Sequence, residues 1–244
     1  DNVPMLQNCA PVTEEEAGNP CALLLLWSTN MSLIEVGPIN GRHEIGENIW
    51  LLTQVELGKL QQGFVYECAT DYCNDPSKLK LLIQSVTFKN YYESIVPLLI
   101  SDQEPLPAIQ LCLEYSNSTD VNFIEPYCST SVDLDVCTHC RTAMEMNVSS
   151  TQMCMWCTKS GYDIFFEDRV VYALHNRTQL RQHFSIQCSN IKDCNSFENI
   201  KQIEKFYSME FDFDRFLGSY TTTASSTAPA LFPIIYFLPL ILLS

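Results

Sequence analysis

Two Cys-x2-Cys pairs give this sequence its sharpest chemical pattern. Cys137 and Cys140 form the first pair, and Cys154 and Cys157 form the second after an interval of thirteen residues. Four thiolates at this spacing could hold a zinc ion in tetrahedral geometry. A Cys-x2-Cys pair with a low-pKa thiol could instead carry redox chemistry. In an oxidising compartment the same four residues cross-link, and we expect them to form structural disulfides.

The complete set of cysteines favours cross-linking over metal binding. The chain has 12 cysteines, an even number, and none of them lies in the apolar C-terminal segment. We expect all of them to pair, with each disulfide stabilising the fold by about 2–4 kcal/mol. The predicted disulfide residues are Cys9, Cys21, Cys68, Cys73, Cys112, Cys128, Cys137, Cys140, Cys154, Cys157, Cys188 and Cys194.

Other residue types give weaker chemical signals. The 4 histidines do not show the His-x3-His or His-Glu-x2-His spacing of metal ligands. Neither a Gly-x-Ser-x-Gly elbow nor a glycine-rich phosphate loop occurs. Glu210, Asp212 and Asp214 form the densest acidic stretch, which we interpret as a strand or a solvated face with a weak calcium signal. We therefore expect no catalytic, cofactor-binding or metal-binding residues and no cofactor.

Asn-x-Ser/Thr triplets indicate N-glycosylation in the secretory pathway. They begin at Asn30, Asn117, Asn147 and Asn176, and each one predicts an exposed position because a glycan cannot be buried. The chain begins at Asp1 without a basic and apolar leader, so we expect that a secretory signal peptide has been removed.

The C-terminal residues 231–244 are apolar except for the final serine. This segment is shorter than the ~20 apolar residues that span a bilayer. Residues 218–230, which precede it, are small and uncharged. Small residues, a polar spacer and a short apolar tail make up a glycolipid (GPI) anchor signal. The candidate attachment residues are Ser219, Ala224 and Ser225, and the alternative is a tail that is retained as a short membrane segment.

The net charge limits the partners. It is −15, from 29 acidic and 14 basic residues, and such an acidic surface disfavours nucleic acid and anionic membrane surfaces. It is typical of a soluble surface and could also suit a basic or calcium-linked partner. We expect an extracellular protein or glycan ligand, and contact with the membrane only through the lipid anchor.

A shared cysteine pattern predicts two divergent modules. The pattern is a cysteine, four or five residues, a Cys-Asn pair and then an expected helix. It occurs at Cys68, Cys73 and Asn74 and again at Cys188, Cys194 and Asn195. The predicted boundaries are 1–101 for the first cysteine-rich module, 102–107 for a linker, 108–217 for the second module, 218–230 for a stalk with the attachment site, and 231–244 for the hydrophobic signal.

Short apolar runs and turn signals predict a disulfide-rich α+β fold, in which each module has short strands and a helix after its Cys-Asn pair. A helix should open at Pro76 with Asp75 as its cap and bury Leu79, Leu82, Ile83 and Val86. Gly37-Pro38 and Asn40-Gly41 should be turns. The expected strands cover 21–27, 48–55, 64–68, 164–166, 170–174 and 183–187, and a second helix is expected at 202–211.

The Cys-Asn endings and the glycolipid tail together resemble the lymphocyte-antigen/urokinase-receptor group of surface proteins. The matching residues are Cys68, Cys73 and Asn74 in the first half and Cys188, Cys194 and Asn195 in the second. The resemblance implies three-finger β domains in which the Cys-Asn pair packs into the disulfide core. The first half has fewer cysteines than such a domain normally carries.

Residues 128–194 also resemble the PSI module of plexins, semaphorins and integrins. The match is the series Cys128, Cys137, Cys140, Cys154, Trp156, Cys157, Cys188 and Cys194, in which Trp156 would pack in the core. The loop before Cys188 is longer than that module allows.

Both resemblances imply receptor or adhesion proteins and not enzymes. We therefore expect a non-catalytic, glycolipid-anchored surface glycoprotein on the extracellular face of the plasma membrane. The alternatives are a secreted or surface hydrolase with dispersed catalytic residues, and a structural coat protein.

Overall fold

The computed structural model describes most of the central part of the chain. The described residues are 21–28, 32–38, 46–56, 59–68, 70, 72–73, 75–101, 112–118, 137–159 and 164–218. They form a disulfide-rich, mostly β-sheet protein with a few short helices.

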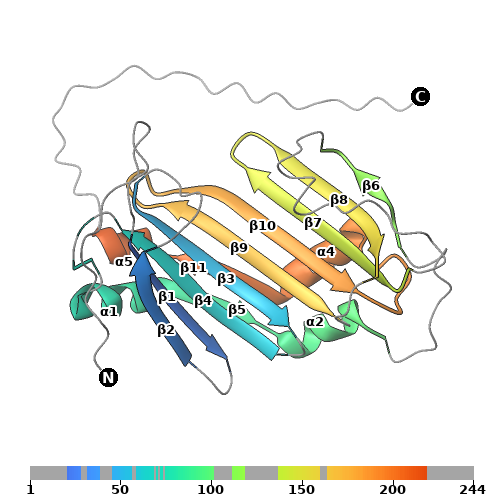
Figure 1. Ribbon diagram of the computed structural model, residues 1–244, viewed down its shortest axis with the longest axis horizontal. Coiled ribbons are helices and arrows are strands. Elements are labelled where there is room, and N and C mark those ends of the chain that lie inside the picture. Colours follow the sequence, from blue (N-terminus) through green and yellow to red (C-terminus); the bar gives the residue numbers. More distant parts are fainter. Residues whose placement is uncertain are drawn as a thin grey trace.

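A nine-stranded sheet dominates the structure (Figure 1). The strand order is β2-β1-β4-β3-β9-β10-β7-β8-β6, and all neighbouring strands are antiparallel. The strands are β1 (Cys21–Ser28), β2 (Ser32–Pro38), β3 (Asn48–Glu56), β4 (Lys59–Cys68), β6 (Tyr115–Ser116), β7 (His139–Asn147), β8 (Thr151–Thr158), β9 (Phe165–Ala173) and β10 (Thr178–Cys188).

The helices and a separate strand pair lie on one face of this sheet, behind it in the view of Figure 1. The pair is β5 (Val86–Asn90) with β11 (Tyr207–Phe211). The helices are α1 (Pro76–Ser85), α2 (Tyr92–Leu99), α4 (Phe197–Ile203) and α5 (Phe213–Leu217), and a 3₁₀ turn, η3 (Glu204–Phe206), follows α4. We call the opposite face, which no described helix covers, the helix-free face.

The strand order is reversed from one half of the sheet to the other. The first half reads β2-β1-β4-β3 and the second β9-β10-β7-β8, so the two orders mirror each other across the β3–β9 pair. Leu52 and Arg169 are cross-strand partners at the centre of that register. Helices from the two halves of the chain also contact each other, because α1 contacts α5 and α2 contacts α4. The nine strands nevertheless form one sheet, so the predicted division into two modules is not confirmed, and the predicted linker 102–107 lies outside the described residues.

Two apolar cores fill the space between the sheet and the helices. One contains Leu51 and Val170, and the other contains Val55 and Phe166. Polar residues occupy the intervening positions of the same strands, where Thr53 and Asp168 are direct cross-strand partners. Hydrogen bonds extend this row to the neighbouring strands. We call the row the polar band, and its residues are Asn90, Gln62, Thr53, Asp168, Gln182 and Tyr207.

The helix α1 forms as the sequence predicts. The Asp75 side chain accepts hydrogen bonds from the N–H groups of Ser77 (2.8 Å) and Lys78 (3.2 Å), and Pro76 occupies the first turn. Leu82 is fully buried in the first core, but Ile83 is 50% exposed. Val86 begins the strand β5, so the apolar stripe of the helix is narrower than expected.

The predicted strands at 21–27, 48–55, 64–68 and 183–187 are confirmed with longer boundaries. The two predicted strands at 164–166 and 170–174 are parts of one strand, β9. Two other expectations are wrong. Gly37 and Pro38 end the strand β2, where a turn was expected, because β2 pairs along the whole of β1. Of the expected helix at 202–211, Gln202 and Ile203 are the last residues of α4, and η3 and β11 replace the rest, since Phe211 and Met209 alternate into the core beside β5. Asn40 and Gly41 lie outside the described residues.

Among the described residues, no helix has both the length and the apolar composition needed to cross a membrane.

Candidate functional site

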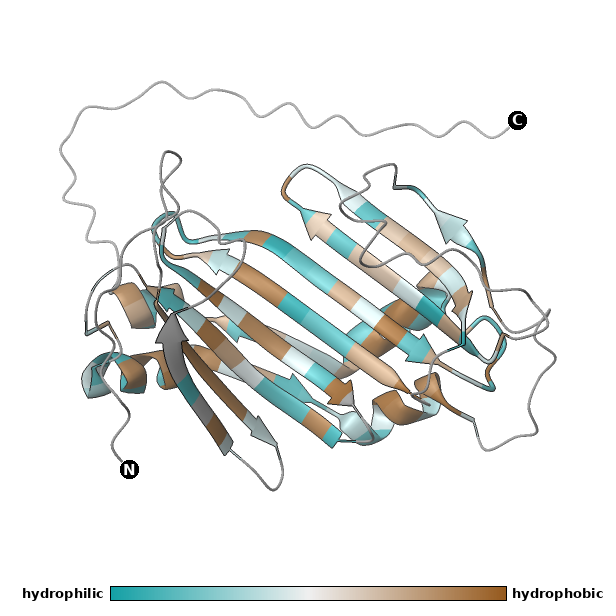
Figure 2. Ribbon diagram, in the orientation of Figure 1, coloured by the Kyte–Doolittle hydropathy of each residue, from teal (hydrophilic) through white to brown (hydrophobic). Residues whose placement is uncertain are grey.

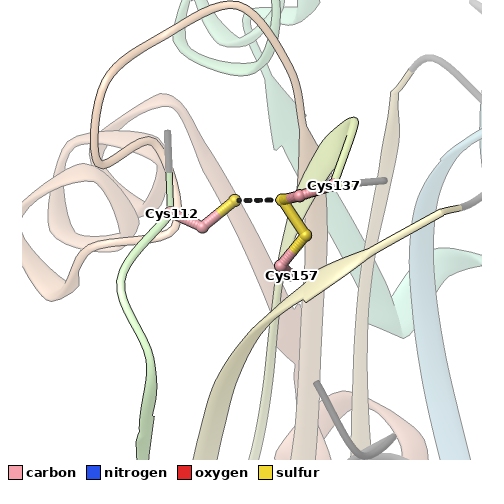
Figure 3. A group of neighbouring side chains, drawn as sticks. All are labelled: Cys112, Cys137 and Cys157. Atoms are coloured by element: carbon pink, nitrogen blue, oxygen red, sulfur yellow. Dashed lines mark hydrogen bonds between the residues drawn. A yellow bond between two sulfur atoms is a disulfide. The ribbon is translucent and has the colours of Figure 1, made fainter. Parts of the chain in front are cut away.

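Cys112, Cys137 and Cys157 gather at one end of β7 and β8 (Figure 3). Cys137 is bonded to Cys157, Cys112 is bonded to Cys140, and the Sγ atoms of Cys112 and Cys137 are 3.6 Å apart. The sulfurs of Cys112, Cys137 and Cys157 lie within 4.8 Å of one another. Because each sulfur is already in a disulfide, a metal ion would have to displace both bonds. The arrangement therefore cross-links the sheet, which is the role expected from the sequence.

The remaining described disulfides close the two Cys-Asn loops. Cys68 is bonded to Cys73 and Cys188 to Cys194. Cys21 and Cys154 are disulfide-bonded as well, and no described cysteine is free. Cys9 and Cys128 lie outside the described residues.

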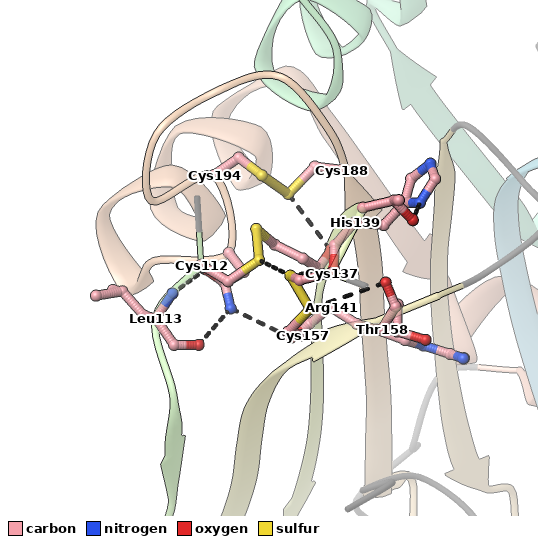
Figure 4. Close-up of a disulfide and its surroundings, with 12 residues drawn as sticks. Cys112, Leu113, Cys137, His139, Arg141, Cys157, Thr158, Cys188 and Cys194 are labelled. Atoms are coloured by element: carbon pink, nitrogen blue, oxygen red, sulfur yellow. Dashed lines mark hydrogen bonds between the residues drawn. A yellow bond between two sulfur atoms is a disulfide. The ribbon is translucent and has the colours of Figure 1, made fainter. Parts of the chain in front are cut away.

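Figure 4 shows the disulfides Cys137–Cys157 and Cys188–Cys194 with Leu113 close to them. Asn195 is fully buried and joins three segments of the chain. Its Oδ1 accepts a hydrogen bond from the N–H of Leu113 (2.9 Å), and its Nδ2 donates to the carbonyl oxygens of Leu113 (2.8 Å) and Arg141 (3.4 Å). The hydroxyl of Thr142 donates to the Asn195 carbonyl oxygen (2.8 Å). Asn195, the residue after Cys194, thus holds these segments together by hydrogen bonds. Its counterpart Asn74 lies outside the described residues.

The helix-free face carries a group of charged and aromatic side chains. Strand alternation puts Leu24, Val65, Trp50, Val171 and Arg181 in one cross-strand row. The next row is Leu26, Gly63, Leu52, Arg169, His183 and Glu145. The face is therefore aliphatic on β1 and β4 and charged on β9, β10 and β7. Figure 2 shows the alternation of apolar and polar residues along these strands.

Trp50 lies between two arginines on this face. The guanidinium carbons of Arg169 and Arg181 are 5.8 and 5.1 Å from its ring centroid, within the range of cation–π contact. Arg141 is placed in the same way over Trp156 (5.6 Å) and Phe165 (5.7 Å). The ion pair between Arg169 and Glu167, at 2.6 Å, offsets part of the positive charge.

His183 is surrounded by these arginines. Burial lowers the pKa of its imidazole to about 4, and the charges of Arg169, Arg141 and Arg181 act in the same direction. Burial also lowers the pKa of Arg141. The indole N–H of Trp50 and the Nε of Arg141 are buried and have no hydrogen-bond partner among the described residues. Such orphaned donors require an explanation, and a bound partner that accepts from them is one. We call Trp50, Arg141, Arg169, Arg181 and His183 the arginine–tryptophan cluster.

A cavity of about 230 Å³ lies on the other side of the sheet, between β9, β10 and β11. Asp168 is 2% exposed at its base, and Gln182 Nε2 donates to both carboxylate oxygens at 2.9 Å. The residues that line it are Asp168, Val170, Tyr172, Gln179, Gln182, Glu204, Tyr207, Ser208 and Met209. Desolvation raises the pKa of Asp168 to about 7, although hydrogen bonds from Gln182 and Tyr207 partly oppose the shift.

Three of the predicted glycosylation residues are exposed at one end of the sheet. Asn147 ends β7, Asn176 is in the turn between β9 and β10, and Asn117 lies beside the start of β8. Asn117 also donates from Nδ2 to the Thr151 carbonyl oxygen (3.1 Å). Asn30 lies outside the described residues, and whether any of the four carries a glycan stays a prediction.

The described chain ends at the same end of the sheet. Arg177, in the turn between β9 and β10, forms an ion pair with Asp214 and donates to the Gly218 carbonyl oxygen (2.6 Å). Asp212 caps α5 by accepting from the Arg215 N–H (3.0 Å). The acidic stretch at 210–214 is thus divided among β11, a cap and an ion pair. Ser219, Ala224 and Ser225 lie outside the described residues.

Comparison of the chain with protein-family models, with curated proteins and with solved structures finds no match. The resemblances to three-finger and PSI-like proteins therefore stay predictions.

The arginine–tryptophan cluster and the cavity were missed by the sequence analysis. The sequence of 165–173 nevertheless contains an indication of both, because its residues alternate between the two faces of a strand. Asp168 has the parity of Phe166 and Val170, so a strand in this segment must bury a carboxylate. Arg169 has the opposite parity and must lie on the other face. The partners from β3 and β10 depend on long-range pairing and could not be identified in this way.

Proposed function

We propose that this chain is a non-catalytic, glycolipid-anchored glycoprotein of the extracellular cell surface, and that it binds a protein partner through the helix-free face of its sheet. The anchor is supported by the composition of residues 218–244, and an oxidising location is compatible with the disulfides.

The observation that carries the proposal is the position of Trp50 between Arg169 and Arg181. Tryptophan and arginine are the residue types that most often dominate the energy of protein interfaces. Here they lie on a broad, sheet-like surface with aliphatic neighbours on β1 and β4, which is a shape that suits a protein more than a small ligand.

The charge of the cluster indicates the chemistry of the partner. Three of the six arginines in a chain of net charge −15 lie on this face. Guanidinium groups bind carboxylates in a bidentate manner. We therefore propose a partner that presents Asp and Glu side chains around an aromatic or aliphatic residue.

The test is a binding measurement on the immobilised full-length chain. The probe is an acidic copolymer of glutamate and tyrosine, with heparin as an anionic glycan and polylysine as a cationic control. We expect saturable binding of the acidic copolymer that weakens as salt increases. The variants Arg181→Glu and Trp50→Ala should each weaken it at least tenfold.

Arg215→Glu is the matched control, because Arg215 is an exposed arginine on α5, on the other side of the sheet. It should leave binding within twofold of the native chain. Equal losses in Arg181→Glu and Arg215→Glu, or no saturable binding of the copolymer, would contradict the proposal. A preference for heparin would replace the protein partner with an anionic glycan.

A further inference from the structure

The cavity at the polar band is separate from the proposed binding face, because the sheet lies between them. Its floor is Asp168, on the helix-covered side of β9, whereas its neighbour Arg169 belongs to the helix-free face. Its rim includes Glu204 and Gln179, both exposed. The cavity therefore connects a buried carboxylate with the protein surface.

Asp168 has no cationic partner among the described residues. The neighbouring charges that act on it are those of Glu204 and Glu167, and both are acidic. Its hydrogen-bond donors, Gln182 and Tyr207, are neutral. A buried carboxylate without a counter-charge is costly, so proteins usually pair such a group. A cation that enters the cavity would supply the counter-charge that no described residue provides.

The remaining walls suit an organic cation. Tyr172 and Tyr207 contribute aromatic rings, which attract ammonium groups, and Val170 and Met209 contribute apolar surface. The volume of about 230 Å³ equals that of several water molecules and lies below the range of drug-sized ligands.

We propose that this cavity binds a small organic ammonium ion, with Asp168 as the buried counter-ion, Glu204 as a second carboxylate at the rim, and Tyr172 and Tyr207 as aromatic walls. The polar band then has a binding role in addition to separating the two cores. Gln182 holds both oxygens of Asp168, which fixes the carboxylate toward the cavity.

Binding of the cation requires the ionised form of Asp168. Because its pKa is about 7 in the empty cavity, the cation must displace a proton below that pH. The titratable groups that face Asp168 are Glu204, Tyr207 and Tyr172. Burial raises the pKa of Glu204, and the charge of Lys201 partly opposes this shift. Burial also raises the pKa values of Tyr207 and Tyr172. Glu167 contributes from the opposite face. Asp168, with its pKa of about 7, changes charge between pH 5.5 and pH 8.

The experiment compares cations with an uncharged molecule of the same shape. Choline and ethanolamine are titrated into the full-length chain by calorimetry at pH 8, with 3,3-dimethylbutan-1-ol as the neutral counterpart of choline. We expect saturable binding of at least one cation and none of the neutral alcohol. At pH 5.5 the binding should be about tenfold weaker or more.

The Asp168→Asn variant should weaken cation binding at least tenfold at pH 8 and remove its pH dependence. The rim variant Glu204→Gln, at an exposed position that does not endanger folding, should weaken binding by about threefold. Glu67→Gln is the matched control, because Glu67 is a buried acid on the opposite face of β4.

Several results would overturn the proposal. These are equal binding of choline and the neutral alcohol, unchanged binding in both Asp168→Asn and Glu204→Gln, and the absence of saturable binding of either cation to the folded native chain.

Discussion

Gly63 lies where β4 meets β1 on the helix-free face. A Cβ atom added to it would be 2.1 Å from the Leu25 carbonyl oxygen and 2.6 Å from Leu26 Cδ2. The first of these atoms belongs to the backbone, so it cannot move aside without disturbing the pairing of β1 with β4. The glycine is required by this close approach and not by an unusual backbone angle.

The substitution Gly63→Ala should therefore destabilise the protein by about 2–3 kcal/mol, at the upper end of overpacking in a core. Denaturant unfolding measures the change. Lys59→Ala, at an exposed position in the same strand, should stay within about 0.5 kcal/mol of the native chain. Equal stabilities of the two variants would show that β1 does not pack against Gly63 as described.

The contribution of His183 to the stability of the protein should be lost as the pH falls from 6.5 to 4. Its pKa is about 4 in the folded chain and 6.5 when unfolded, so the unfolded state binds the extra proton in this window. Stability from this group is complete above pH 6.5 and is lost as the pH falls, by up to about 3 kcal/mol. The free energy of unfolding of the native chain relative to His183→Gln should therefore fall by up to about 3 kcal/mol between pH 6.5 and pH 4. A constant difference would contradict the assignment.

The titration of Asp168 should change the free energy of unfolding with pH in the opposite direction. Its pKa rises from 3.8 to about 7 on folding, so the folded state binds the extra proton between these values. Stability from this group is present below pH 3.8 and is lost as the pH rises to 7, by on the order of 4 kcal/mol. Asp168→Asn should gain stability relative to the native chain at pH 8 and little at pH 4. A constant difference across this range would refute the burial of an ionisable carboxyl.

At the scale of elements, short contacts from Asn195 hold segments that are distant in sequence. The side chain bonds to Leu113, next to Cys112, and to Arg141 on β7. Cys112 is itself bonded to Cys140 of β7, so the amide and the disulfide fix the same connection. The edge strand β6, close after Leu113, is positioned by this pair of links.

The substitution Asn195→Ala should destabilise the protein by about 2–3 kcal/mol, because it removes the side-chain hydrogen bonds to the partly buried backbone of Leu113 and Arg141. Hydrogen exchange should increase at 113–118 more than at β9. Lys192→Ala, at an exposed position in the same loop, is the control and should change neither quantity. Unchanged exchange at 113–118 in Asn195→Ala would show that the disulfide alone holds this segment.

The elements also show what the sequence could reveal. Local signals found α1 from Asp75 and Pro76, and found β1 and β3 from their apolar runs, because caps and apolar periodicity act within one segment. They failed at 207–211, where the alternation of Tyr207, Met209 and Phe211 is short and resembles the end of a helix. The strand forms there because β5, more than 100 residues earlier, offers a partner.

At the scale of the molecule, one end of the sheet differs from the other. The turns after β7 and β9 carry Asn147 and Asn176, and Arg177 ties Gly218 to the same end. Under the proposed anchorage, the stalk at 218–230 begins beside these two positions. The helix-free face would then be left to the partner.

Glycan mapping tests this arrangement. We expect Asn147 and Asn176 to be modified in the chain isolated from its native membrane, because both are exposed at hairpin ends. Enzymatic deglycosylation in heavy-oxygen water should convert both residues to labelled aspartate. Asn117, whose amide is bonded to β8, should be modified to a lower extent. Unlabelled Asn147 and Asn176 would contradict the secretory route.

The whole account depends on a sheet cross-linked in an oxidising compartment, and peptide mapping of the full-length chain without reduction tests this most directly. The structure predicts the pairs Cys68–Cys73, Cys112–Cys140, Cys137–Cys157 and Cys188–Cys194. Recovery of these four linked peptides would support the fold and the proposed location. Free thiols at Cys137, Cys140, Cys154 and Cys157, or a zinc ion bound by them, would contradict both.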